Sequence, residues 1–218
     1  MSIAVRWDVS IGPFCMSRSR SRTTTDIQPD LLGGGGEPAQ IHRLFFALMP
    51  GEAVARQIEH AAAGVAATQP MHARMIRPSR YHVTLHFLGD HPMLREDIVR
   101  AAIDAAGKLA VEPFELVLDS VSGFHGREPP CVLRCSQVPD GLLKLWEDLR
   151  QALVLAGLGQ HLSRSFTPHV TFAYSRGALP QMVSIEPIRW RVDGCSLLHS
   201  IVGGGEYRTL GTWPFQQG

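Results

Sequence analysis

Residues 81–87 read YHVTLHF, and residues 168–173 read PHVTFA. β-Branched and aromatic residues are frequent in both stretches, which is typical of strands. Side chains alternate between the two faces of a strand. We therefore expect His82, Thr84 and His86 to share one face, with the apolar residues between them facing a core.

The second stretch repeats the pattern of the first. Val170 and Phe172 are expected to face the core, and His169 and Thr171 the opposite side. If the two copies belong to two similar lobes, a pseudo-twofold arrangement brings both His-Thr pairs together. One His-x-Thr is a weak signal, whereas two copies on strand-like segments at domain-scale separation are much more specific.

Two imidazoles and two hydroxyls suit hydrolysis of a phosphodiester. An unperturbed His titrates near pH ~6.5, so one ring can be a neutral base while the other is a charged acid. Threonine hydroxyls can donate to the phosphate oxygens on which charge develops. We therefore predict that His82 and His169 are the catalytic pair and that Thr84 and Thr171 bind the substrate.

Outside these stretches, helices and strands follow one another without a sustained parallel βαβ rhythm. This order predicts an α+β fold with antiparallel sheets. The expected strands are residues 43–49, 81–88, 114–121, 131–137, 166–174, 188–198 and 207–213, and the expected helices are residues 52–67, 93–109 and 141–155.

Residues 1–40 differ in character from the rest of the chain. They contain a Ser/Arg run at residues 17–22 and a glycine tract at residues 33–36, with no helical or strand period. We interpret them as a flexible N-terminal extension that precedes a folded domain of residues 41–218. The Ser/Arg run could contact RNA phosphate, but a solvated tail is the simpler interpretation.

The composition bounds the function further. The chain has 218 residues, 44% of them hydrophobic, and a formal net charge of +1. Because dedicated nucleic-acid binders are usually strongly basic, any contact with RNA is expected to be local to a site. No apolar run reaches the roughly 20 residues that span a bilayer. We expect a cytoplasmic monomer that does not associate with membranes.

The paired motifs resemble the hallmark of the 2H phosphoesterases, and within them the RNA 2′,3′-cyclic phosphodiesterases formerly called 2′-5′ RNA ligases. The likeness extends to RLFFAL at residues 43–48, to Arg77-Pro78 ahead of the first motif, and to Thr-Trp-Pro at residues 212–214. The resemblance implies a bilobal α+β fold. In that fold two pseudo-symmetric antiparallel sheets, flanked by helices, enclose a central cleft.

The resemblance also implies an activity. This is hydrolysis of 2′,3′-cyclic phosphates, at RNA 3′ ends or on nucleosides, to 2′-phosphomonoesters, without a metal ion or other cofactor. In that scheme His169 activates the attacking water and His82 protonates the departing 3′ oxygen. The reverse reaction, 2′-5′ joining of RNA ends, is expected as a minor activity.

Two positions depart from the family pattern. His86 stands where relatives often carry Arg or Lys, and it can bind phosphate only when protonated. Tyr174 stands where relatives often carry an Arg that holds phosphate, and Arg176 is a candidate to replace it. Phe124 and Tyr81 are candidates to stack a terminal base.

Two alternative functions stay open. One is a 2H phosphodiesterase that acts on another small cyclic or 2′-5′ phosphodiester. The other is a non-catalytic RNA-end-binding module that keeps the fold. The remaining histidines show no zinc-ligand spacing, so we predict no metal site.

Overall fold

The computed structural model describes residues 40–68, 73–124, 128–175 and 183–216. All of them belong to one unit, Glu37–Gly218. Almost the whole of the expected N-terminal extension lies outside the described residues, and so does Arg176.

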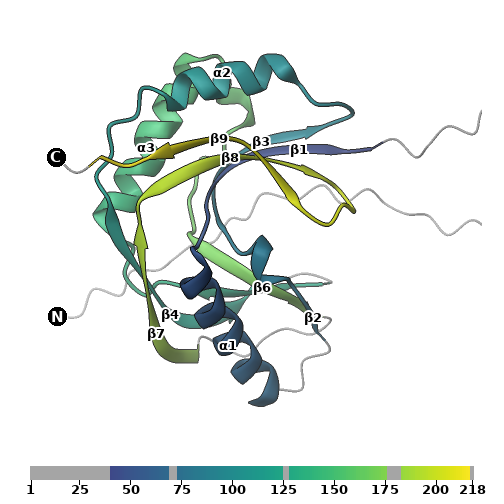
Figure 1. The fold of residues 1–218 in the computed structure, drawn as a ribbon, viewed down its shortest axis with the longest axis vertical. Helices are drawn as coiled ribbons and strands as arrows, with labels where there is room; N and C mark the ends of the chain where they lie inside the picture. The colour runs from purple at the N-terminus through teal and green to yellow at the C-terminus, as the bar shows by residue number, and fades with distance from the viewer. Residues whose placement is uncertain (1–39, 69–72, 125–127, 176–182, 217–218) are drawn as a thin grey trace, which may run out of the picture. The chain divides into compact units, whose positions relative to one another are not determined.

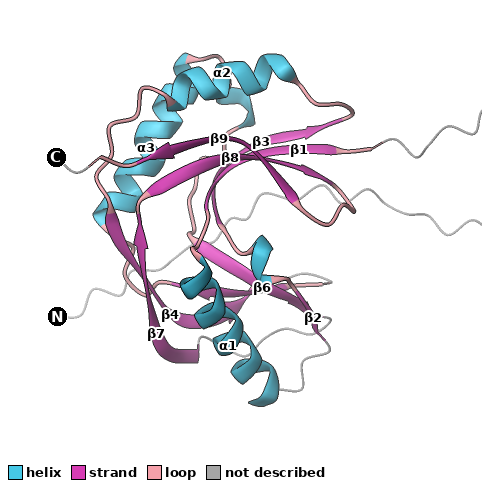
Figure 2. Ribbon diagram, in the orientation of Figure 1, coloured by secondary structure: helices cyan, strands magenta, loops and turns pink. Residues whose placement is uncertain are grey.

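Helices and strands form close to where the apolar patterns predict them, and the α+β class is confirmed (Figure 2). The helices are α1 (Glu52–Thr68), α2 (Glu96–Ala106) and α3 (Asp140–Leu155), with two short 3₁₀ turns, η1 (Pro78–Arg80) and η2 (Gly159–His161). The strands are β1 (His42–Leu48), β2 (Ala73–Met75), β3 (Val83–His91), β4 (Phe114–Gly123), β5 (Pro130–Arg134), β6 (His169–Ser175), β7 (Val183–Val192), β8 (Gly194–Ile201) and β9 (Tyr207–Pro214).

The strands of the described residues form a single antiparallel sheet with the order β7-β4-β5-β6-β3-β1-β8-β9, and β2 pairs with β6. The two sheets implied by the family resemblance are therefore two halves of one sheet. The halves meet where β3 lies beside β6, through a single register pair, Val83 with Val170. Each half thus contributes one His-Val-Thr strand to the junction.

Helix α1 covers part of one half of the sheet, and α2 and α3 lie mainly over the other half. Helix α1 packs on β6 and β7, whereas α2 and α3 pack on each other and reach β9, β3 and β4 (Figure 1). The main core lies between these helices and the sheet. A smaller apolar cluster of Phe45, Ala47 and Leu198 lies on the other face of the sheet, because Phe45 and Ala47 alternate with core residues along β1.

The prediction of a single strand at residues 188–198 is wrong, because the chain forms two strands there. β7 ends at Val192 and pairs with β4, while β8 begins at Gly194 and pairs with β1 and β9. Asp193 is the point where the chain passes from one half of the sheet to the other. A Cβ at Gly194 would lie 2.9 Å from the carbonyl oxygen of Trp213, so glycine permits this close approach. Apolar residues continue across the break, which hides it in the sequence.

Strands β3 and β6 carry a bulge at the same position of the repeat. Leu85 has no register partner on β1, and Phe172 has none on β5. An extra residue reverses the alternation of side chains beyond it. Phe87 and Tyr174 consequently return to the face of the two motif histidines, and each is 36% exposed.

The bulge also makes the expected position of His86 wrong. Its side chain is 2% exposed and lies on the core side of β3. Its Nε2–H donates to the carbonyl oxygen of Trp146 at 2.8 Å, and the indole N–H donates back to the Leu85 carbonyl at 3.1 Å. Burial lowers the pKa of His86 to about 4, so the ring is neutral and ties α3 to the sheet. It is not placed to hold phosphate.

Replacement of His86 by Ala is expected to lower the free energy of unfolding at pH 7 by about 2 kcal/mol, because a buried carbonyl loses its donor and a cavity forms. The stabilisation from a lowered His pKa is present above the unfolded pKa and is lost as the pH falls toward the folded value. Wild type should therefore lose more stability between about pH 6.5 and pH 4 than His86→Ala does. Urea unfolding over this pH range measures both effects.

The matched control is His60→Ala, since His60 is exposed on α1. It should leave the free energy of unfolding at pH 7 nearly unchanged. Equal effects of the two substitutions would contradict the structural role of His86.

Candidate active site

The Val83–Val170 pair places four polar side chains together. Both valines are fully buried, so the residues on either side of each valine point to the opposite face of the sheet. These neighbours are His82, Thr84, His169 and Thr171, all half-buried.

The two histidines occupy equivalent places beside the Val83–Val170 pair. Each directly precedes one of the paired valines, so both side chains lie on the same face of the sheet at the junction of its two halves.

Both imidazoles are held in the same way. The Nδ1 of His82 lies 2.8 Å from the carbonyl oxygen of Arg80, and the Nδ1 of His169 lies 2.7 Å from that of Thr167. A carbonyl only accepts, so each Nδ1 carries the proton and each neutral Nε2 keeps its lone pair. Each ring thus presents Nε2 as the nitrogen that can take up or release a proton.

His82 lies in an aromatic surrounding. The rings of Phe45 and Tyr207 have centroids 5.2 Å and 5.3 Å from the imidazole centroid. The pKa of His82 is lowered to about 4, chiefly by burial; the Arg80 carbonyl opposes the shift, and the charges of His169 and Arg80 add to it.

His169 has a matching arrangement. The ring of Phe124 meets it edge-on, with centroids 5.0 Å apart. Arg134 is its register partner on β5, and so lies on the same face of the sheet. Burial lowers the pKa of His169, the Arg134 charge adds to this, and the Thr167 carbonyl opposes it.

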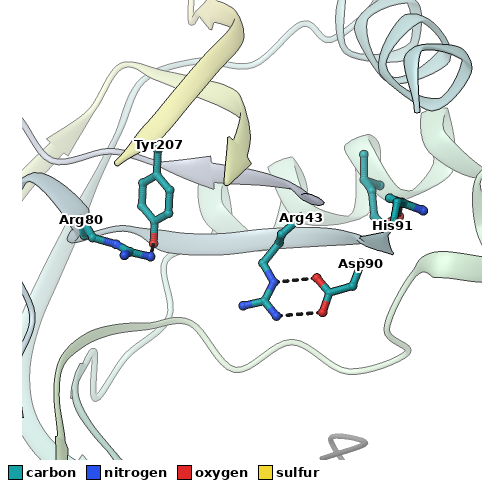
Figure 3. Close-up of polar contacts among 6 residues, drawn as sticks. Arg43, Arg80, Asp90, His91 and Tyr207 are labelled. Atoms are coloured by element: carbon teal, nitrogen blue, oxygen red, sulfur yellow. Dashed lines mark hydrogen bonds and ion pairs between the residues drawn. The ribbon is translucent and has the colours of Figure 1, made fainter. Parts of the chain in front are cut away.

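Two arginines near the histidines carry no ion pair among the described residues, namely Arg80 and Arg134. Arg80 donates to the Gly204 carbonyl at 3.2 Å and to the Tyr207 hydroxyl at 3.3 Å, and its guanidinium lies 4.7 Å from that ring centroid (Figure 3). Arg43 differs, because it makes a two-point ion pair with Asp90 at 2.8 Å. Positive charge without a carboxylate partner next to two histidines favours an anionic ligand.

The other residues that the sequence predicts for the site are not all found near the two histidines. Phe124 lies beside His169, as a residue of the predicted site should. Tyr81 is only 1% exposed and packs in the core, where burial raises its pKa to about 12. It cannot stack a base, and this expectation is wrong. Arg176 lies outside the described residues.

Sequence reasoning missed Arg80, Arg134, Phe45 and Tyr207. Arg80 stands two residues before His82, but nothing in the sequence indicates that its carbonyl holds the ring. The other three come from strands β5, β1 and β9, and reach the site only through cross-strand pairing. No local pattern carries that information.

A comparison with models of protein families matches residues 50–203 to the 2′-5′ RNA ligase superfamily. The chain belongs to this superfamily. The match spans both His-Val-Thr strands, and it supports the wider class of 2H phosphoesterases and a phosphodiesterase activity. A comparison with curated protein sequences gave no match.

Solved structures similar to this superfamily member agree with the fold. The crystal structure of E. coli LigT in apo form is 28% identical, covers 82% of this chain and 99% of its own, and superposes with a TM-score of 0.65. A crystal structure described as a phosphoesterase is 26% identical, with 81% and 99% covered and a TM-score of 0.66. A protein from Thermus thermophilus is 25% identical, with 79% and 97% covered and a TM-score of 0.64.

Two further observations concern the described part of this superfamily member. It contains no group of three or more His, Cys, Asp or Glu residues arranged to hold a metal ion. Its helices include none that is long and apolar enough to cross a membrane.

We expect NMR of ¹⁵N-labelled histidine to show protonated Nδ1 and unprotonated Nε2 for both His82 and His169 at pH 7. Their pKa values should lie below the ordinary value of about 6.5. Inorganic phosphate should raise both pKa values, because an anion between the rings favours the charged form. His60, which is exposed on α1, is the internal control. A protonated Nε2, or indifference of both rings to phosphate, would contradict this geometry.

Proposed function

We propose that this protein hydrolyses RNA 2′,3′-cyclic phosphate ends to 2′-phosphomonoesters, by acid–base catalysis with two histidines and without a metal ion. The observation that carries the proposal is the meeting of two His-Thr pairs on one sheet face, with both Nε2 atoms left as proton carriers. Two rings on opposite sides of one phosphate can serve an attacking and a departing oxygen in the same step.

The proposed reaction is a single displacement at phosphorus. His169 takes a proton from water through its Nε2, and the water oxygen forms a bond to phosphorus. The bond between phosphorus and the 3′ oxygen breaks, and the Nε2–H of His82 donates its proton to that oxygen. The 2′ ester bond stays intact. With the 5′-hydroxyl of a second RNA in place of water, the same steps in the same direction give the minor 2′-5′ joining reaction.

The mechanism also requires that the negative charge on the phosphate oxygens be stabilised during the reaction. The hydroxyls of Thr84 and Thr171 are proposed to donate to the two non-bridging oxygens. Arg134, a cation beside His169, is proposed to stabilise the charge that builds up during attack. Removal of one such donor typically costs about 10²–10³-fold in turnover.

Protonation of His82 has to accompany substrate binding. Its pKa is about 4, chiefly because burial disfavours the charged ring. The phosphodiester carries a negative charge, and an opposite charge nearby favours the imidazolium form. We propose that the bound substrate itself raises the pKa of His82 into the range where it acts as the acid.

Structures of the similar E. coli protein LigT were determined in complexes with 3′-AMP, ATP and phosphate. These ligands share the phosphate chemistry that the present site suits. We propose that nucleotides or RNA 3′ ends bind this chain at the same histidines, with Phe124 beside the terminal base. Another small cyclic or 2′-5′ phosphodiester stays the alternative substrate, and a binding module without turnover is the alternative role.

Hydrolysis of 2′,3′-cyclic AMP and of a short RNA with a cyclic phosphate end, both in EDTA, tests the proposal. Phosphorus NMR should locate the product phosphate on the 2′ oxygen. His82→Ala and His169→Ala should each lose roughly 10²–10⁴-fold in kcat, the usual contribution of one proton transfer. Thr84→Ala and Thr171→Ala should lose less.

His60→Ala serves as control and should keep full activity. Near-normal kcat in either active-site His variant would refute the acid–base pair. RNA binding without any product would instead support the alternative that the protein is a non-catalytic RNA-end-binding module.

The roles of the two histidines can be separated with a cyclic phosphate that carries sulfur in place of the 3′ oxygen. A thiolate leaves without help from an acid, so His82→Ala should recover most of its lost activity on this substrate. His169→Ala should not recover, since water still needs a base. For each variant, recovery is measured as the ratio of kcat on the sulfur substrate to kcat on the oxygen substrate. Recovery of His169→Ala alone would reverse the assignment of acid and base.

A further inference from the structure

The segment that leads into the first motif is rich in arginine. Residues 73–82 contain Arg74, Arg77 and Arg80 and no acidic residue. The three arginines occupy β2, the link to η1, and η1 itself. Arg74 and Arg77 are exposed and Arg80 is half-buried. We call these three side chains the arginine strip.

One end of the arginine strip lies at the edge of β6. Arg74 is the register partner of Tyr174, and its guanidinium lies 5.3 Å from the centroid of that ring. The bulge at Phe172 returns Tyr174 to the same face as His169. Arg74 is therefore held on the catalytic face by an exposed aromatic ring, and cation–π stacking leaves its N–H groups able to donate.

The other end lies at the turn between β8 and β9. A terminal nitrogen of Arg77 is 4.0 Å from the position that a Cβ would occupy on Gly205. Arg80 is fixed to the Gly204 carbonyl and to Tyr207, whose ring also contacts His82. The strip thus extends from the C-terminal end of β6 to the turn beside His82.

The charge of the strip is not neutralised within the described residues. Arg74, Arg77 and Arg80 make no ion pair there, and neither does Glu206, the acidic residue of the neighbouring turn. Other exposed arginines of the chain do find carboxylates, such as Arg189 with Glu115. Three cations without partners on one short segment provide a local attraction for a polyanion, although the whole chain has a net charge of only +1.

We propose that the arginine strip binds the sugar–phosphate backbone of single-stranded RNA upstream of the terminal cyclic phosphate. The inference rests on the proposed function, since it takes His82 and His169 as the place of the terminal group. It goes beyond that function in naming where the RNA upstream of the terminal group binds. The protein should prefer an oligonucleotide with several phosphates over a nucleoside 2′,3′-cyclic phosphate, which has no upstream phosphate for Arg74 and Arg77.

The test compares wild type with the double variant Arg74→Gln/Arg77→Gln on two substrates, a ten-nucleotide RNA with a cyclic end and 2′,3′-cyclic AMP. The variant should lose at least tenfold more kcat/KM on the RNA than on cyclic AMP. Phosphate contacts to a single strand give a salt slope of about 0.7 each, so the slope of log kcat/KM against log salt should become shallower by about 1.4. Arg80 is left intact because it contacts the surroundings of His82.

The matched control is Arg100→Gln/Lys108→Gln, which removes two exposed cations on and just after α2, in the helical layer on the other side of the sheet. It should affect neither the substrate preference nor the salt slope. Equal losses of the strip variant on the two substrates, or a wild type that does not prefer the RNA, would overturn the proposal.

Failure of the proposed function is recognised separately. If neither substrate is turned over, fluorescence anisotropy with a labelled single-stranded RNA that ends in a 3′-phosphate tests the strip by itself. About tenfold weaker binding of the strip variant than of the control variant would support the strip as an RNA surface. Equal binding by both variants would refute it.

Discussion

The pairing of Val83 with Val170 is the interaction on which the site depends. It is the one register pair between β3 and β6, and it joins the two halves of the sheet. Since both valines face the core, the flanking His and Thr residues of both strands are directed to the other face. A slip by one residue on either strand would direct that strand's histidine into the core. The placement of the motif histidines and the packing of the core are therefore fixed by the same contact.

The internal repeat extends beyond the motif itself. Each histidine donates to the carbonyl two residues before it, each has an aromatic neighbour, and each strand bulges three residues after its histidine. The two halves differ in their charged neighbours, which are Arg80 near His82 and Arg134 near His169. The repeated strands thus hold His82 and His169 in similar ways. Arg80 and Arg134, which are not part of the repeat, make the surroundings of the two histidines different.

Burial and positive charge both disfavour protonated histidines in the free site. The same features favour a bound anion, because a phosphate group supplies the counter-charge for the arginines and for one imidazolium at once. The site is in this sense complementary to a charged ligand. Its low histidine pKa values come chiefly from burial, and the charges of Arg80 and Arg134 add to them.

The sequence by itself determined the α+β class and the two strands that carry the His-Val-Thr repeat, because period-two alternation and the duplicated pattern are local signals. Only the tertiary structure decided where alternation fails. It moved His86 into the core through a bulge, divided residues 188–198 between two halves of the sheet, and buried Tyr81. It also brought Arg134 and Tyr207 to the histidines. These features depend on cross-strand register, and register is set by contacts between residues far apart in the chain, which no local pattern encodes.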